Sequence, residues 1–263
     1  DEIPEDAKLA VIFAPGRDYD QSSLKKLDTF LSNNEKLGKS LVFVPNTQPD
    51  QIPELNSFLE EWGMSVGSGV MFELSTDHLY NNTTPFWSAA EYVDEDYSSV
   101  ITNKSIPVSV MQSRPIEILK ESESIKVLLE STENSGIYPV DAAEGWQPEE
   151  SDLTGPVTLA AVSTKQVSGV DDVSNVAVVG SAAAFASSLL SSTSVNNSAY
   201  FINMFNTLAE REDTVLIEAK TLGGATMSVT TNVSIPLGVV FTIVLPLLIL
   251  VTGLVIWIRR RNR

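Results

Sequence analysis

The longest run of apolar residues along the chain is Ile235–Ile258, and it contains no charged residue. An α-helix needs about 20 apolar residues to cross a hydrocarbon core of ~30 Å, so this run is long enough. A helix of this length in a soluble protein usually keeps one polar face, which is missing here. The pattern predicts a single C-terminal transmembrane helix over residues 235–258, with a polar linker at 221–234 and a basic tail at 259–263.

Charge is distributed unevenly on the two sides of this span. Four of the last five residues are arginines, whereas residues 228–234 carry no charge. Cytoplasmic flanks of transmembrane helices are enriched in Lys and Arg, so we expect a cytoplasmic C-terminus and an N-terminal domain outside the cell membrane. All 34 acidic residues precede the span, so the exported part carries a net charge of about −21. Such a surface repels phosphate backbones, and we expect no nucleic acid partner.

A domain that is exported ahead of its membrane anchor needs a targeting signal upstream. The first 20 residues offer only the short apolar run Leu9–Ala14 and no starting Met. We therefore expect either a cleaved signal peptide or a first transmembrane helix before this chain.

Strand and helix patterns alternate in the first 63 residues. The apolar runs Lys8–Pro15 and Ser40–Pro45 predict two strands buried on both faces. Between them, Asp20 can cap a helix that has its leucines on one stripe, and a further helix is expected from Pro53 to Gly63. Strand, helix and strand at this spacing predict an α/β fold.

The rest of the domain continues this mixture, although residues 65–104 give a weak signal and leave room for a second lobe. Gly180 is expected to turn from a strand into an Ala-rich helix that carries Phe185, Leu189 and Leu190, and Asn196–Ser198 can cap a last helix. Together the patterns predict a three-layer α/β domain over residues 1–220, flavodoxin-like or glutamine-amidotransferase-like. The further strands that we expect are Ile106–Met111, Ile116–Leu119, Ile125–Leu129, Val157–Val162, Val176–Val179 and Val215–Ala219.

Polar residues follow several of these strands. In open α/β sheets, ligands bind beyond the carboxyl ends of the strands, so these residues are the candidates for a ligand site. The same residue types are also common in ordinary turns. The candidate ligand-binding residues are Arg17, Asp18, Asn46, Asn134, Ser135 and Ser181.

The usual catalytic and cofactor motifs are missing from the sequence. It has no Cys and a single histidine, His78, which argues against thiolate chemistry, a histidine metal cluster and a Ser-His-Asp triad. Neither a phosphate-binding P-loop nor a dinucleotide-binding glycine motif occurs, and Ser181 lacks the G-x-S-x-G context of a nucleophile elbow. The acidic cluster Asp94–Asp96 lacks the spacing of a calcium loop and is expected to be a solvated turn. We expect no catalytic residue, no metal and no cofactor.

Several segments, taken in order, resemble one known family. They are IPEDAKLAVIFAPGRDYD, KSLVFVP, IKVLLESTENS, GPVTLAAV, NVAVVGSAAAFAS, NSAYFINMFNTLAERED and the C-terminal LPLLILVTGLVIWIRRR. Together they are similar to the GldG-like auxiliary components of ABC-type transport systems, first associated with gliding motility. Where that family tends to read N-A-L-N-W-L, this chain has Asn203–Leu208 and no tryptophan.

The resemblance implies an accessory or binding subunit that works with an ABC permease and a cytoplasmic ATPase, with cargo or a second envelope protein as a possible further partner. Within the lipid bilayer, Gly238 and Gly253 would allow close approach of the permease, Pro246 would leave a carbonyl for it to satisfy, and Trp257 would lie at the inner interface. A stand-alone membrane-anchored receptor or adhesin and an ectohydrolase are the alternative functions.

Overall fold

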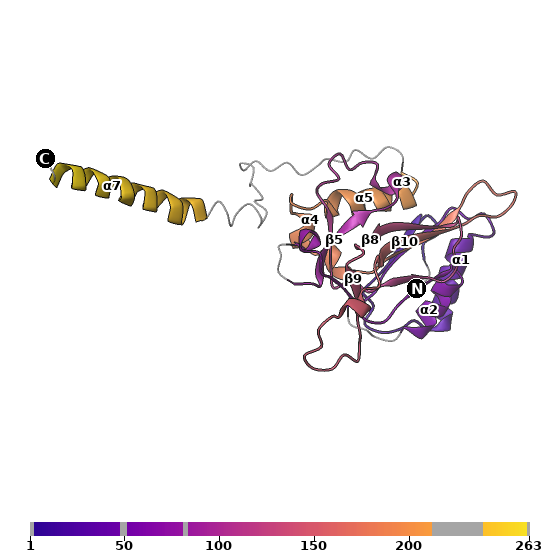
Figure 1. The fold of residues 1–263 in the computed structure, drawn as a ribbon. Helices are drawn as coiled ribbons and strands as arrows, with labels where there is room; N and C mark the ends of the chain where they lie inside the picture. Colours follow the sequence, from indigo (N-terminus) through magenta and orange to yellow (C-terminus); the bar gives the residue numbers. More distant parts are fainter. Residues whose placement is uncertain (1–2, 48–51, 81–83, 212–238, 262–263) are drawn as a thin grey trace. The chain divides into compact units, whose positions relative to one another are not determined.

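The computed structural model describes residues 3–47, 52–80, 84–211 and 239–261. The chain forms two compact units, residues 1–219 and residues 220–263. The predicted strand Val215–Ala219, the linker 221–234 and Gly238 lie outside the described residues. The first unit is mixed α/β, as the sequence predicts, and it contains a curled seven-stranded sheet (Figure 1).

The sheet combines a parallel part with an antiparallel part. Strands β1, β2 and β11 are parallel to one another, and every other neighbouring pair is antiparallel. The apolar run of β2 is buried on both faces, as predicted. The same prediction is wrong for β1, where Val11 and Phe13 are about half exposed because β1 is the last described strand on its side of the sheet. In spatial order the strands are β1 (Leu9–Phe13), β2 (Ser40–Val44), β11 (Ser174–Val179), β10 (Thr158–Lys165), β8 (Ile125–Glu130), β5 (Trp87–Tyr92) and β6 (Val108–Met111).

Helices pack on both faces of this sheet. Helices α1 (Gln21–Ser32) and α2 (Pro53–Glu60) share one hydrophobic cluster with alternate residues of β2 and β11. Helix α5 (Asn197–Leu208) shares the other cluster with the intervening residues of the same strands. The side chain of Asp20 caps α1 as predicted, accepting a hydrogen bond from the Ser23 amide at 2.7 Å.

Residues 65–104, where the sequence signal is weak, belong to the same compact unit. Part of the region forms β5, and part forms two small antiparallel pairs beside the main sheet. These pairs join β3 (Met64–Val66) to β7 (Ile116–Ile118) and β4 (Val70–Glu73) to β9 (Ser135–Tyr138). Two short helical segments, η1 (Thr76–His78) and α3 (Glu95–Ser98), complete it.

The predicted Ala-rich helix after Gly180 is wrong as a continuous element. The chain forms a 3₁₀ turn, η4 (Ala182–Phe185), and then a single helical turn, α4 (Ser187–Leu190), with Ala186 extended between them. The Phe185 ring lies 4.2 Å from the Phe201 ring, measured between centroids, so packing of this side chain against α5 overrides the helix preference of the alanines.

The second unit contains the apolar helix. One turn of π-helix, η5 (Val240–Val244), precedes α7 (Leu245–Arg261), and together they are long and apolar enough to cross a membrane. The π turn ends two residues before Pro246, whose ring would clash with the Thr242 carbonyl, four residues back, in a regular α-helix. Arginines 259–261, expected in the tail, continue the helix, and Arg261 lies 5.4 Å from the Trp257 ring centroid.

Asn197 fastens the start of α5 to the edge of the sheet. It is fully buried, its Nδ2 donates to the carbonyls of Ser109 and Ala184 at 2.8 Å each, and its Oδ1 accepts from the Ser109 amide at 2.8 Å. Truncation would leave these three backbone groups without their partner, and each unsatisfied buried group costs about 1–3 kcal/mol.

We expect Asn197→Ala to lower the free energy of unfolding by about 2–4 kcal/mol, allowing for partial access of water to the freed groups. Chemical denaturation of residues 1–219 measures this. The matched control is Asn103→Ala, because the exposed Asn103 side chain accepts only a local bond from Ser105. Equal effects of the two substitutions would contradict the anchoring role.

Candidate functional site

The topology places the sequence-predicted site residues at the carboxyl ends of strands that run in the same direction. Strands β1, β2 and β11 run in one direction, and β8 shares that direction because it is two antiparallel steps from β11. The carboxyl ends of all four strands therefore lie at the same end of the sheet. The candidate residues follow these strand ends, and they are Arg17, Asp18, Asn46, Asn134, Ser135 and Ser181.

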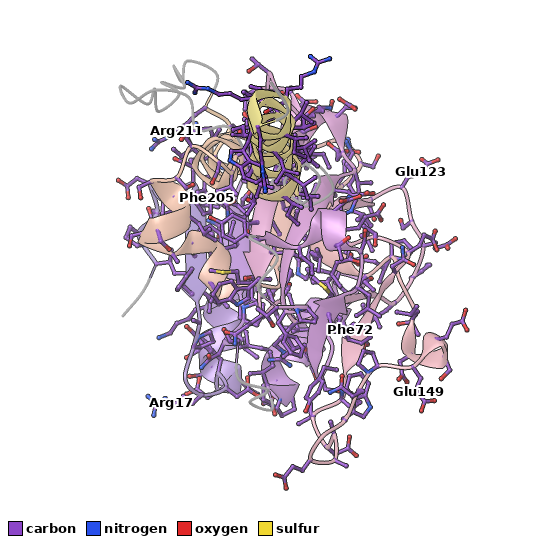
Figure 2. All side chains as sticks on the ribbon, turned by 60° about the vertical axis from the view of Figure 1, so that its left-hand side comes forward. Arg17, Phe72, Glu123, Glu149, Phe205 and Arg211 are labelled. Atoms are coloured by element: carbon purple, nitrogen blue, oxygen red, sulfur yellow. The ribbon has the colours of Figure 1, made fainter. Side chains whose placement is uncertain are left out.

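Asp18 at this edge caps a helix other than the one that follows it in sequence. Its two carboxylate oxygens accept hydrogen bonds from the amides of Glu54 and Leu55, at 2.8 and 3.1 Å. These amides belong to the first turn of α2, which lacks a side-chain cap of its own. Arg17, by contrast, is exposed and extends away from the ribbon in Figure 2.

The two serines of the candidate set are fully buried. Ser181 donates from its Oγ to the Met111 carbonyl at 2.6 Å and accepts from the Ala184 amide. Ser135 lies 2.6 Å from the Ser131 hydroxyl and donates to the Thr132 carbonyl. Both hydroxyls therefore hold turns in place, and neither faces solvent. Asn46 is half-buried, and Asn134 is exposed.

His78 has partners that its isolated position in the sequence did not indicate. Its Nδ1 lies 3.3 Å from the Ser75 hydroxyl, and its Nε2 lies 3.2 Å from Glu91 Oε1. Ser75 precedes η1 directly, so the Ser–His contact is local, whereas Glu91 comes from β5. The order resembles a nucleophile–base–acid chain, but the serine faces Nδ1 rather than the Nε2 of a serine-hydrolase triad. Among the described residues, no group of three or more His, Cys, Asp or Glu side chains is placed to hold a metal.

Acidic side chains crowd the neighbouring part of β8. Glu130 pairs in register with Glu91 on β5. Partial burial, with the charges of Glu91 and then Glu133, raises the pKa of the Glu130 carboxyl above its ordinary value. The Glu130 carboxyl is therefore harder to ionise in the folded state than in the unfolded state, so its ionisation lowers the stability of the fold.

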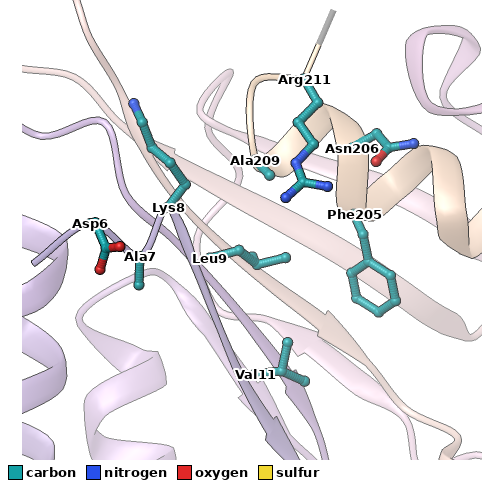
Figure 3. Close-up of a pocket in the computed structure, with 9 residues that line it drawn as sticks. All are labelled: Asp6, Ala7, Lys8, Leu9, Val11, Phe205, Asn206, Ala209 and Arg211. Carbon is teal, nitrogen blue, oxygen red and sulfur yellow. The ribbon is translucent and has the colours of Figure 1, made fainter. Parts of the chain in front are cut away.

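A groove of about 650 Å³ lies at the opposite end of β1 from Arg17. Sequence patterns did not indicate it, because its walls come from segments about 200 residues apart. Leu9 and Val11 of β1 face Phe205 of α5 and the following Arg211 across the hollow (Figure 3). An ion pair of 3.2 Å between Lys8 and Glu210 joins the two walls. The groove is thus apolar along its floor and charged at its rim.

A second hollow of about 500 Å³ lies between the end of α1 and the loop that joins β10 to β11. Trp62 and Leu31 line it, and the Lys165 ammonium lies 5.7 Å from the Trp62 ring centroid. The lysine covers the aromatic face, which is a common arrangement for an amphipathic side chain at a surface.

Substitution of Asp18 tests whether this residue at the carboxyl ends of the strands stabilises the fold as a helix cap or is kept for a ligand. We expect Asp18→Ala to lower the free energy of unfolding by about 1 kcal/mol, the typical value for loss of a helix cap. Arg17→Ala, at the adjacent exposed position, should change it by less than about 0.5 kcal/mol. Thermal and chemical denaturation measure both. A stable Asp18→Ala variant would remove the capping role.

Glu130 generates a pH-dependent prediction. Because folding raises the pKa of Glu130, the ionised carboxyl destabilises the folded state. This destabilisation disappears as the pH falls below the pKa of the unfolded state, near 4.5. We expect Glu130→Gln to be more stable than the parent at pH 7 and to lose that advantage on acidification to about pH 4. Glu123→Gln, at an exposed loop position, controls for removing one negative charge. An advantage that persists at pH 4 would contradict the assignment.

Comparison with known proteins shows the fold alone. No family model and no curated protein matches this chain. Among solved structures, the N-terminal domain of mmIFT52 is similar, with a TM-score of 0.57 over 82% of this chain and 84% of that chain. The sequence identity is 15%, so the similarity extends to the α/β architecture and not to an activity.

Proposed function

We propose that this protein is a non-catalytic, membrane-anchored accessory or binding subunit of an ABC-type transport system. The observation that carries the proposal is the helix Val240–Arg261, which is apolar and exposed along its whole length and ends in three arginines. Its location would be the cell membrane, with residues 1–220 outside and the C-terminus in the cytoplasm, as the charge asymmetry implies. The GldG-like resemblance of the sequence supplies the identity of the partners, a permease and an ATPase.

The composition of the helix favours a protein partner over a simple lipid tether. Lipid gives no hydrophobic drive for helix association, so contacts form where backbones approach closely or polar groups find partners. A Cβ added at Gly253 would meet nothing within 4 Å, so this glycine is not required by packing within the described chain. Pro246 cannot donate to the preceding turn, which leaves a carbonyl for a neighbouring helix.

The described serines and His78 do not form the nucleophile–base arrangement of a serine hydrolase, which supports recognition rather than catalysis as the role of the domain. The buried serines hold turns, the Asp18 carboxylate caps α2, and His78 is held by Ser75 and Glu91 in the wrong ring order for a serine hydrolase. The flavodoxin-like or glutamine-amidotransferase-like layering expected from the sequence belongs to this proposal as well, and it is supported by the parallel strands β1, β2 and β11.

Purification of the full chain in mild detergent tests the partners. We expect a permease and an ATPase to co-purify, because the helix would pack on the permease within the membrane. The matched control replaces residues 239–261 with an unrelated single-span helix of equal length and keeps the arginines. Retention of both partners by the control would place the contact in the exported domain. Loss of the ATPase from both preparations would favour the free receptor or adhesin.

Orientation is tested in the same cells. The chain has no Cys, so Ser228→Cys gives a single labelling position. We expect an impermeant maleimide to label it in intact cells, and labelling only after lysis would reverse the proposed orientation.

A further inference from the structure

The hollow between the end of α1 and the β10–β11 loop has walls that are bonded to one another. The Ser174 hydroxyl donates to the Leu31 carbonyl at 2.7 Å, and the Gly38 amide donates to the Val173 carbonyl at 3.2 Å. These bonds join the end of α1 to the start of β11, so the hollow is preformed. Its volume of about 500 Å³ lies within the usual range of small-molecule sites, about 300–1,000 Å³.

The floor of the hollow is apolar and contains one aromatic ring. Leu31, Leu37 and Trp62 line it, and each is less than a tenth exposed. The Lys165 ammonium lies 5.7 Å from the Trp62 ring centroid, within the ~6 Å range of a cation–π contact. The chain's own lysine therefore shows that this ring face accepts an alkylammonium group.

Two carboxylates border the same hollow. Asp28 of α1 and Glu35 of the turn that follows it line the hollow, and both residues are exposed. Within the described part of the chain, neither carboxylate has an ion pair or a hydrogen bond. Lys165 is the one basic side chain among the described residues that line the hollow, and it contacts the ring instead of either carboxylate. The charges around the hollow therefore favour a further cation.

The turn after α1 places Glu35 and Leu37 at the hollow through an unusual backbone. Asn33, Asn34, Glu35 and Leu37 have φ values of 46°, 56°, 67° and 60°, all in the left-handed region. Asn33 in this conformation is an ordinary helix C-cap. The same conformation is unfavourable for Glu35 and Leu37, because their Cβ atoms crowd the backbone. Strained backbone of this kind gathers at binding and catalytic sites.

We propose that this hollow binds a small organic ammonium compound. The ammonium group takes the place of Lys165 on the face of Trp62, and the carboxylates of Asp28 and Glu35 balance its charge. Alkylated ammonium groups suit the site because they combine a positive charge with an apolar surface. The exported part carries about −21, which raises the concentration of cations near its surface. The site is independent of the proposed transport partners, because binding of this ligand requires neither a permease nor an ATPase.

Calorimetric titration of the full chain with choline tests the proposal, in a maltoside detergent that carries no ammonium group. The matched ligand is the neutral carbon analogue of choline, in which a tert-butyl group replaces the trimethylammonium group. The two ligands have nearly the same shape, so a difference in affinity reports the charge. We expect choline to bind at one site per chain and at least about tenfold more tightly than the neutral analogue.

Substitution of the two carboxylates locates the binding in this hollow. We expect the double variant Asp28→Asn with Glu35→Gln to weaken choline binding about tenfold. The control is Glu121→Gln with Glu123→Gln, which removes two negative charges from an exposed loop that does not line the hollow. Salt screens these distant charges, so the control should change the affinity by less than about twofold.

Substitutions of Trp62 and Lys165 should act in opposite directions. Trp62→Phe keeps a buried aromatic ring but attracts cations less strongly, so we expect weaker choline binding, by about threefold. Lys165→Gln removes the ammonium that competes for the ring, so we expect choline to bind more tightly by a similar factor. A melting curve of each variant confirms that the domain is folded.

Three outcomes would overturn the proposal. Equal affinity for choline and its neutral analogue would show that the hollow does not recognise the charge. Equal weakening by the two double variants would reduce the effect to the net charge of the domain. No saturable binding of choline by the parent or by the Lys165→Gln variant would show that the hollow takes no ammonium ligand.

Discussion

Strand β2 imposes the main constraint on this fold. All five of its residues are buried, and it has a parallel neighbour on each side. Parallel neighbours cannot be joined by tight turns, so the chain must cross the sheet through helices, and those helices must cover both faces. Helices α1 and α2 do so on one face and α5 on the other. Successive residues of β2 and β11 alternate between the two clusters, and β10 contributes residues to both, so these strands form the layer that separates them.

Local pattern predicts the elements that this constraint produces, but it does not predict their partners. The run Ser40–Pro45 identifies β2 because a continuous apolar run needs two covered faces. Asp20 identifies the start of α1 because its cap is a local bond. The parallel pairing of β11 with β2, however, joins Asn175 to Ser40 and so depends on contacts between segments far apart in the sequence. The weak strand β5 is likewise held by its neighbours rather than by a strong intrinsic preference.

The candidate site shows a similar division. The rule that polar residues gather at the carboxyl ends of strands places Asp18, Ser135 and Ser181 on one edge. It cannot say whether their polar atoms face a ligand or the protein's own backbone. Asp18 completes the first turn of α2, a helix about 35 residues further along the chain, and no local spacing reveals such a cap. The groove beside β1 escapes sequence analysis for the same reason, because α5 and β1 come from opposite ends of the domain.

The net negative charge of the domain protects edge strand β1 from pairing with another copy of the protein, a protection that the residues of β1 itself do not provide. Natural edge strands usually avoid intermolecular pairing through charged or proline residues within the strand, but β1 has neither between Leu9 and Phe13. Its groove instead has charged residues at the rim, and the exported part as a whole carries about −21. Two such domains repel each other at distances up to the Debye length, which is about 8 Å at physiological ionic strength. At that separation the strands are not yet in hydrogen-bonding contact, so repulsion acts before pairing can begin. The surface charge therefore opposes pairing of this strand with the same strand of another copy of the protein.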